Sequence, residues 1–353
     1  MQKSFTRKFL SNSTATLYVV AFFVACFAIF LGISIGSLSI PFSSIMNILF
    51  HTWFGVPLDK GIPSNIVQVV VSIRLPRVTL AFLVGASLAL AGTAFQGLLK
   101  NALADPYTLG VSSGASVGAV FVLFFGIQIP FIGKFTLPVI SIVTGLCTLF
   151  LVLAFARAVE RKMSIETIIL TGIIFSAFFS SLISLMIALT GEELRQIISW
   201  LLGSVAMRSW DYTLMILPFF VIGSLLLLLN SRELNAFAFG ETVAANLGVD
   251  VLRRKLVILI GASLLTGAAV AVSGTIGFVG LIVPHITRLL CGANHRRLLP
   301  LSLLYGGSFL VLADLVARTI ISPRELPIGV ITSLIGAPIF ALLYFKRMKR
   351  KTG

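Results

Sequence analysis

Long apolar segments without a charged residue are the feature that most constrains how this chain can fold. Residues 78–99 and 135–156 are each free of charge and are bounded by basic residues. A helix that crosses a bilayer needs about 20 mainly apolar residues, and both segments meet that length. Of the whole chain, 58% is hydrophobic and 11% is charged, whereas a soluble domain carries about a quarter charged residues. The sequence therefore predicts an integral membrane protein.

Ten mainly apolar segments predict an all-α, polytopic membrane protein in which residues 1–353 form a single transmembrane domain. The segments are 16–36, 78–99, 107–127, 135–156, 165–189, 212–230, 256–273, 275–290, 298–317 and 327–345. The charge-free region 256–287 decides the count, because it is too long for one untilted helix and short for two. Gly274, Gly277, Gly280 and Pro284 supply breaks in this region. One helix there gives nine spans, and two give ten.

Basic residues at both ends of the chain favour ten spans. Lys3, Arg7 and Lys8 precede the first span, and residues 346–351 read Lys-Arg-Met-Lys-Arg-Lys. Basic segments stay in the cytoplasm, so both termini are expected there, which requires an even number of spans. The cytoplasmic segments then include the N-terminal tail 1–15, the loop 231–255 and the basic tail 346–353.

The first apolar run is predicted to be a retained span rather than a signal peptide. It is about 20 residues long, which suits a span, and it lacks an A-x-A type cleavage site. Segment 37–65 then lies outside the cytoplasm. Its apolar stretch from Ile45 to Val56 has the length of a helix that lies in the membrane interface.

The sequence lacks the motifs of common enzymes. It has no G-x-x-x-x-G-K-[ST] phosphate loop and no G-x-S-x-G nucleophile elbow. Its three cysteines and three histidines show no metal-ligand spacing. We therefore expect a chain that is not an enzyme and binds no metal or cofactor. Because the basic residues sit in short clusters between apolar runs, no nucleic-acid partner is expected.

An ion-coupled secondary carrier is the alternative from a different class. Such a carrier usually keeps ionisable groups at mid-membrane, where each costs about 2.5–3.5 kcal/mol to insert. Here Asp314 and Glu166 lie near predicted span ends, and Asp105 precedes Pro106 as a helix N-cap. Because the span interiors hold almost no such group, an energy source outside this chain is favoured.

Three arginines are expected at the outer face. Arg74 and Arg77 precede the second span, and Arg318 lies at the end of the ninth. Arginines on that side run against the general charge distribution of membrane proteins. Their side chains either extend along the membrane interface or form a basic docking surface for an acidic partner through charge-assisted pairs.

The longest cytoplasmic loop, 231–255, contains a predicted short helix between Gly240 and Gly248. Val243 and Leu247 are one helical turn apart, and Gly248 suits the C-cap. This helix is either an ordinary loop helix or a docking helix for a cytoplasmic motor.

A series of short motifs runs through nearly the whole chain. They are Arg-Leu-Pro-Arg at 74–77, Val-Gly-Ala-Ser-Leu-Ala-Leu-Ala-Gly at 84–92, Asn-Ala-Leu-Ala-Asp-Pro at 101–106, Leu-Gly-Val-Ser-Ser-Gly-Ala at 109–115, Gly-Thr-Ile-Gly-Phe-Val-Gly-Leu-Ile-Val-Pro-His at 274–285 and Glu-Leu-Pro-Ile-Gly at 325–329. Together and in this order they resemble the iron-siderophore and cobalamin permease family of ABC importers. Ala102 departs from the family pattern, which more often has proline there.

The resemblance implies a type II ABC importer permease in the bacterial plasma membrane, with four kinds of partner. These are a second permease (the same chain or a paralogue), two cytoplasmic ATPase subunits that bind ATP and Mg, an extracytoplasmic binding protein, and the lipid bilayer. Ferric siderophore is the implied cargo, with haem and cobalamin as alternatives.

By matching motif, the resemblance also assigns three groups of residues. Arg74, Arg77 and Arg318 would dock the binding protein. The coupling residues facing the ATPase would be Leu234, Asn235, Ala236, Gly240, Glu241, Leu247 and Gly248. The broken helix along the pathway would contain Gly274, Gly277, Gly280 and Pro284.

Overall fold

The computed structural model describes residues 14–36, 40–59 and 61–352, and within them the chain is helical with no strand, as predicted. Lys3, Arg7 and Lys8 lie outside the described residues. The α-helices are α2 (Thr14–Ser34), α3 (Phe42–Phe54), α4 (Ser64–Gln68), α5 (Leu75–Leu98), α6 (Val111–Phe125), α7 (Thr136–Val159), α8 (Ile165–Leu189), α9 (Leu194–Leu201), α10 (Trp210–Leu229), α11 (Ser231–Phe237), α12 (Glu241–Asn246), α13 (Val251–Ser273), α14 (Val279–Cys291), α15 (His295–Thr319) and α16 (Ile328–Thr352).

The apolar helices correspond to the ten predicted spans. Within the described residues, seven helices are long and apolar enough to cross a membrane, and three shorter apolar helices, α6, α14 and the first part of α16, occupy the remaining positions. The predicted break is present, because α13 ends at Ser273 and α14 begins only at Val279. Two helices therefore share the charge-free region, as the ten-span prediction requires.

The second span begins earlier than the predicted residue 78. A continuous helical run extends from Ser64 to Leu98 and includes a π-helical turn at Val69–Arg74. The prediction stopped at Arg74 and Arg77 because charged residues normally end a span. Both side chains are instead buried, with partners inside the protein. The charges are therefore accommodated within the helical run.

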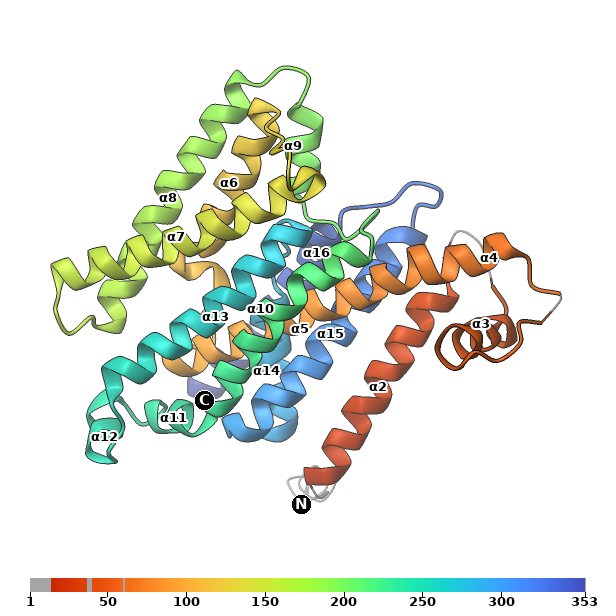
Figure 1. Ribbon diagram of the computed structural model, residues 1–353. Helices are drawn as coiled ribbons and strands as arrows, with labels where there is room; N and C mark the ends of the chain where they lie inside the picture. The colour runs from red at the N-terminus through yellow and green to blue at the C-terminus, as the bar shows by residue number, and fades with distance from the viewer. Residues whose placement is uncertain (1–13, 37–39, 60, 353) are drawn as a thin grey trace.

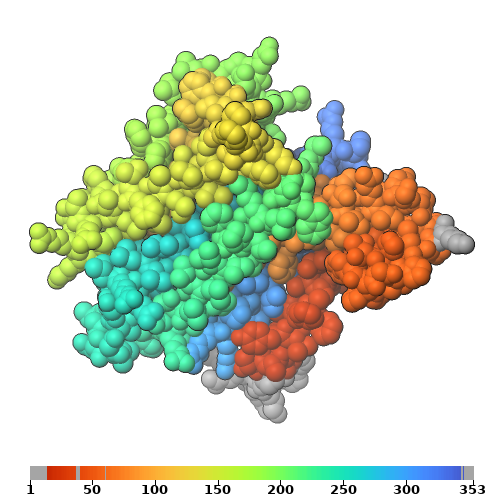
Figure 2. Space-filling model, viewed as in Figure 1, coloured from red at the N-terminus to blue at the C-terminus, as the bar shows by residue number. Residues whose placement is uncertain are grey.

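Helix α5 forms the centre of the molecule. All of its residues except Thr79 and Phe82 are buried, and it packs against α10, α13, α14 and α15. In Figure 2 other helices cover most of the middle of the visible face, where α5 runs in Figure 1. Because lipid supplies no hydrophobic drive between helices, close packing depends on small residues, and α5 is rich in glycine and alanine.

Backbone contact at two glycines of α5 sets the distance to its neighbours. A Cβ atom on Gly85 would lie 2.3 Å from the carbonyl oxygen of Gly306 in α15. A Cβ atom on Gly92 would lie 1.8 Å from the carbonyl oxygen of Gly280 in α14. Both positions therefore exclude any side chain unless a helix moves.

Helix α3 matches the predicted interface helix, with bounds a few residues earlier. Its Ile45 and Ile48 are buried, whereas Phe42, Trp53 and Phe54 are exposed. A short helix with one packed face and exposed aromatic side chains is typical of a helix lying in the headgroup region.

The molecule has two ends with different contents (Figure 1). We call the end that holds Arg74, Arg77 and Arg318 the arginine end, and the opposite end, with α11 and α12, the coupling end. Helix α2 begins and α16 ends on the same side as α11 and α12. An even number of crossings explains this arrangement.

We expect Gly92→Ala to lower the free energy of unfolding by about 1–3 kcal/mol, because the added methyl would collide with the Gly280 carbonyl. The midpoint of thermal unfolding of the purified protein in detergent measures the effect. Gly267→Ala is the matched control, since a Cβ there meets nothing closer than a Val111 methyl at 3.4 Å. Equal midpoints for Gly92→Ala and the wild type would contradict the α5–α14 contact.

Candidate functional site

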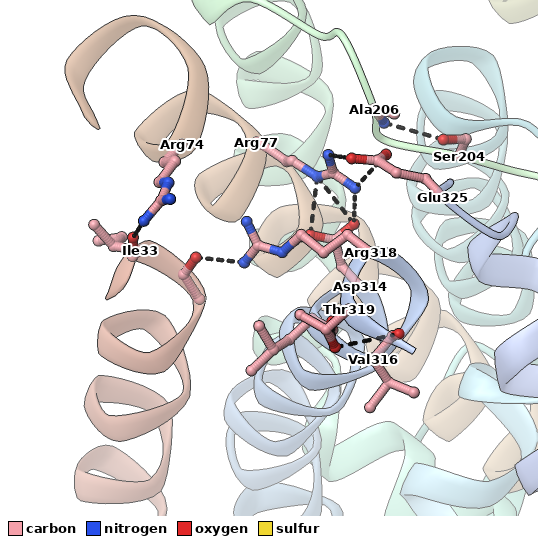
Figure 3. A network of polar contacts seen from close by, with 12 residues as sticks. Ile33, Arg74, Arg77, Ser204, Ala206, Asp314, Val316, Arg318, Thr319 and Glu325 are labelled. Atoms are coloured by element: carbon pink, nitrogen blue, oxygen red, sulfur yellow. Dashed lines mark hydrogen bonds and ion pairs between the residues drawn. The ribbon is translucent and has the colours of Figure 1, made fainter. Parts of the chain in front are cut away.

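Five charged side chains gather at the arginine end (Figure 3). Arg74 ends the π-helical turn, Arg77 lies in the first turn of α5, and Asp314 and Arg318 lie one turn apart near the end of α15. Glu325 lies in the loop between α15 and α16. The exposed fractions of Arg74, Arg77 and Arg318 are 5%, 8% and 7%. The predicted docking arginines are thus brought together, but they are buried rather than displayed on the surface.

Arg77 is held between two carboxylates. Its Nε donates to Asp314 Oδ1 and Oδ2 at 3.1 and 3.0 Å, and its Nη2 donates to Asp314 Oδ1 at 2.8 Å. Its Nη1 and Nη2 donate to Glu325 Oε1 and Oε2 at 2.9 and 3.0 Å. A guanidinium has five N–H donors, and these contacts engage Nε, both donors of Nη2 and one of Nη1. Paired bidentate contacts of this kind are both strong and geometrically specific.

Arg74 and Arg318 fasten the end of α2. Arg74 Nη1 donates to the carbonyls of Ile33 and Ser34 at 2.7 and 2.9 Å, and Arg318 Nη2 donates to the carbonyl of Gly32. The last carbonyls of a helix have no partner within the helix and carry partial negative charge. The two guanidinium groups supply those partners, and they join α2 to the start of α5 and the end of α15.

A cavity of about 260 Å³ opens beside this cluster. Its lining residues are Gly36, Val69, Ile73, Arg74, Arg77, Arg318, Ser322, Pro323 and Glu325. The three guanidinium groups and the carboxylates of Asp314 and Glu325 leave the cluster with one net positive charge. The cavity therefore favours an anionic group.

At the coupling end, α11 is tied to the start of α15. Leu234 is fully buried. The side-chain amide of Asn235 donates to Asn294 Oδ1 at 3.0 Å, and its Oδ1 accepts from the His295 backbone N–H at 2.8 Å. Ala236 packs against the neighbouring apolar cluster. The first predicted coupling residues thus anchor α11 against the bundle.

The predicted short helix is confirmed as α12, which follows Gly240 and is followed by Leu247 and Gly248. Gly240 and Gly248 have φ of 109° and 84°, which favour glycine. Ala244 is buried, whereas Phe239, Val243 and Leu247 are exposed. The helix therefore packs on one side and presents an apolar group of Phe239, Val243 and Leu247 on the other.

Lys255 of α13 connects α12 to the α7–α8 turn. Its side chain is 1% exposed, its Nζ lies 2.7 Å from Glu241 Oε1, and it donates to the carbonyl of Met163 at 3.0 Å. The α7–α8 turn is itself ordered by Glu160, whose carboxylate accepts hydrogen bonds from Ser164 and Thr167. These bonds hold the pKa of Glu160 below its usual range.

The break between α13 and α14 is held by side chains from other helices. The Tyr107 hydroxyl donates to the Ile276 carbonyl at 2.7 Å and accepts from the Ile276 N–H at 3.0 Å. Gln96 donates to the carbonyls of Gly280 and Leu281 at 3.4 and 3.1 Å. A buried backbone group without a partner is costly in lipid, and these contacts satisfy groups that the break exposes.

The four predicted residues of the break have separate roles. Gly274 has φ of 71°, and Gly280 packs tightly enough that a Cβ would meet the Pro106 ring at 2.4 Å. Gly277 has space around it, since a Cβ there would meet nothing closer than Ser333 Oγ at 3.9 Å. Pro284 lies inside α14, where it supplies no N–H to the helix.

The segment after α9 forms the other side of the break. Ser204 donates its backbone N–H to the Ser273 carbonyl at 2.7 Å, and Ile328 donates its own to the Gly203 carbonyl at 3.0 Å. A Cβ on Gly203 would lie 2.4 Å from the Thr275 carbonyl oxygen. The break, the segment after α9 and the start of α16 are therefore in direct backbone contact.

Sequence reasoning missed several residues of these sites. The sequence carries no recognised signal for the roles of Tyr107, Lys255 and Glu325, and it places Asp314 near a span end without indicating its partner. The even-span topology did contain a clue for Asp314, because it places the end of the ninth span on the same side of the membrane as the start of the second. Among the described residues, no group of three His, Cys, Asp or Glu side chains could hold a metal ion.

Comparisons with known proteins place the chain in a family. The model of the FecCD transport family matches residues 23–346. The chain is 57% identical over 347 residues, 98% of each chain, to the uncharacterized ABC transporter permease protein YvrB of Bacillus subtilis. It is 42% identical over 297 residues, 84% of this chain and 79% of the relative, to the cobalamin import system permease protein BtuC of Halobacterium salinarum.

A solved structure has the same fold. It is an inward-facing conformation of a metal-chelate type ABC transporter, with a TM-score of 0.81 and 36% sequence identity. The match covers 95% of this chain and 100% of that chain. The chain therefore belongs to the FecCD transport family and is the permease of an ABC importer, a membrane transport subunit whose ATPase is a separate chain.

Proposed function

We propose that this permease imports a metal chelate, with ferric siderophore as the first candidate, from an extracytoplasmic binding protein into the bacterial cytoplasm. The observation that carries this proposal is the course of α13. The helix begins beside α12, where Lys255 contacts Glu241, and it ends at Ser273, directly before the break. One rigid element thus connects the surface suited to an ATPase with the segment suited to a pathway.

The arginine end is extracytoplasmic in this proposal, and the coupling end and both termini are cytoplasmic. Basic residues support this orientation, because they are frequent in the segments at the coupling end. They include Lys100, Arg157, Arg161, Lys162, Arg232, Arg253, Arg254, Arg296 and Arg297. The exposed apolar group of Phe239, Val243 and Leu247 on this side suits contact with an ATPase subunit.

The arrangement of carboxylates supports an ATP-driven importer over an ion-coupled carrier. Asp314 is engaged by Arg77, and Asp105 accepts the backbone N–H of Tyr107 at 2.9 Å as a helix cap. Both of these carboxylates thus have a structural role and are not available to bind a coupling ion. A carrier would need such groups for its coupling ion.

Cargo selectivity is assigned chiefly to the binding protein, so the permease narrows the cargo only to a class. The similarity to a metal-chelate type transporter supports a chelated metal. The similarity to a cobalamin permease favours cobalamin as the second candidate, ahead of haem. We further propose that two permeases, either two copies of this chain or this chain and a paralogue, assemble with two ATPase subunits.

Uptake into proteoliposomes should stop when the partner ATPase binds ATP without hydrolysing it, because the permease has no energy source of its own. The measurement is accumulation of radiolabelled cargo in vesicles that contain the complete complex and its binding protein. An imposed proton or sodium gradient serves as the control condition. Uptake that persists with the inactive ATPase, or that follows the gradient, would exclude the ABC mechanism.

Replacing Arg74 or Arg318 with Glu should weaken binding of the binding protein by about tenfold or more, because like charges then face each other at the docking surface. The affinity is measured with the permease complex in nanodiscs. Arg324→Glu is the matched control, since Arg324 is an exposed arginine at the same end that has no assigned docking role. Unchanged affinity in correctly inserted Arg74→Glu and Arg318→Glu would refute docking through this cluster.

Lys255→Met should reduce the rate of cargo uptake severalfold more than it reduces the rate of ATP hydrolysis. The substitution keeps an unbranched chain but removes the contacts with Glu241 and Met163, so movement of α12 reaches α13 less effectively. The measured quantity is ATP hydrolysed per cargo molecule imported. Arg253→Met, at an exposed arginine of the same helical turn, is the control and should leave the ratio unchanged. A parallel fall in both rates would instead mean that Lys255 only stabilises the fold.

A further inference from the structure

The docking role proposed for Arg77 meets an obstacle within the chain itself. Of its five N–H donors, four point at Asp314 and Glu325. A partner carboxylate could not form a bidentate pair with Arg77 while both of these carboxylates remain. One of them has to leave before the guanidinium can accept a partner.

The two carboxylates differ in how firmly they are held. The Asp314 side chain is 1% exposed, lies on the rigid helix α15, and also faces Arg318 Nε at 3.7 Å. The Glu325 side chain is 42% exposed and belongs to the loop between α15 and α16. Glu325 can reach water by rotating its side chain, whereas Asp314 cannot do so without displacing α15. Glu325 is therefore the carboxylate that can be exchanged.

The position of Glu325 is the one that a docking carboxylate would need. Glu325 lines the 260 Å³ cavity together with Arg74, Arg77 and Arg318, and its carboxylate faces the Arg77 guanidinium (Figure 3). When Glu325 leaves, three guanidinium groups face a single carboxylate, and the net charge of the cluster rises from one to two. The vacated position then attracts an external anion strongly.

We propose that Glu325 is an internal substitute for the docking carboxylate of the binding protein, and that docking exchanges one for the other on Arg77. This inference rests on the proposed docking function of the arginine end. In the undocked permease, Glu325 keeps the buried guanidinium paired. In the docked complex, the partner's Asp or Glu side chain takes over the contact with Nη1 and Nη2, and Glu325 turns to solvent.

The exchange also provides a route from the docking surface to the break. Leu326, next to Glu325, donates its N–H to the Ala317 carbonyl at 2.9 Å, and Ile328 donates to the Gly203 carbonyl at 3.0 Å. A Cβ on Gly329 would lie 3.0 Å from the Thr275 carbonyl oxygen. Release of Glu325 thus frees a loop that is in backbone contact with the start of α16 and, through Gly203, with the break.

The test measures the affinity between the permease complex in nanodiscs and the binding protein that supports cargo uptake. If Glu325 competes for Arg77, Glu325→Gln should bind about tenfold more tightly, since a charge-assisted contact then no longer has to be displaced. Glu192→Gln is the matched control, because it removes an exposed carboxylate at the same end and so measures the general effect of charge. Its affinity should change by clearly less than that of Glu325→Gln.

Unchanged or weaker binding by a correctly folded Glu325→Gln protein would overturn the inference, as would an equal gain for Glu192→Gln. If Glu325→Gln does not fold, Glu325→Asp decides, since the shorter side chain keeps the charge but cannot keep both contacts to Arg77. It should bind more tightly than the wild type, and equal affinity would refute the exchange. Arg318→Glu separates failure of the carboxylate exchange from failure of docking at the arginine end. If Arg318→Glu loses binding but Glu325→Gln gains none, only the exchange is refuted. If Arg318→Glu has no effect, docking at the arginine end is itself refuted.

Discussion

The irregular backbone and the buried arginines of this apolar bundle depend on partners supplied by the protein, because lipid offers none. The break between α13 and α14 persists because the Tyr107 hydroxyl satisfies both backbone groups of Ile276. The arginine end persists because two carboxylates enclose the Arg77 guanidinium and the carbonyls of α2 receive the other two arginines. Irregular backbone and buried charge, the two features that a membrane helix tolerates least, therefore occur where long-range contacts compensate for them.

This constraint explains which parts of the structure could be predicted from the sequence. Spans, the break and the short helix α12 follow from local features, namely charge-free length, glycine and proline positions, and helical spacing. The true start of the second span does not, because the carboxylate that allows Arg77 to be buried lies 237 residues away in sequence. An arginine without such a partner normally marks the end of a span, which is why the predicted span began after Arg77. Tyr107 was missed for the same reason, since its target, Ile276, is 169 residues distant.

A single helix, α13, extends between the two ends of the molecule. Its 23 residues correspond to about 34 Å at 1.5 Å per residue, which is close to the thickness of the hydrocarbon core, about 30 Å. The helix is buried along most of its length, so it cannot bend without disturbing α5 and α10. In the coupling that we propose, a displacement applied beside Lys255 is therefore transmitted to Ser273 rather than absorbed along the helix.

For the docking that we propose at the arginine end, burial of a charge determines how a partner can bind. Leaving a buried arginine unpaired costs several kcal/mol, so a docking step that merely pulled Glu325 away from Arg77 would be strongly opposed. Exchange of one carboxylate for another avoids that cost, because Arg77 has the same number of partners before and after, while Glu325 regains its hydration. The free energy of docking then comes from the excess positive charge of the cluster and from the remaining interface, and it stays moderate. Moderate affinity suits a partner that has to dock, deliver its cargo and leave, and the return of Glu325 to Arg77 restores the permease to its starting state.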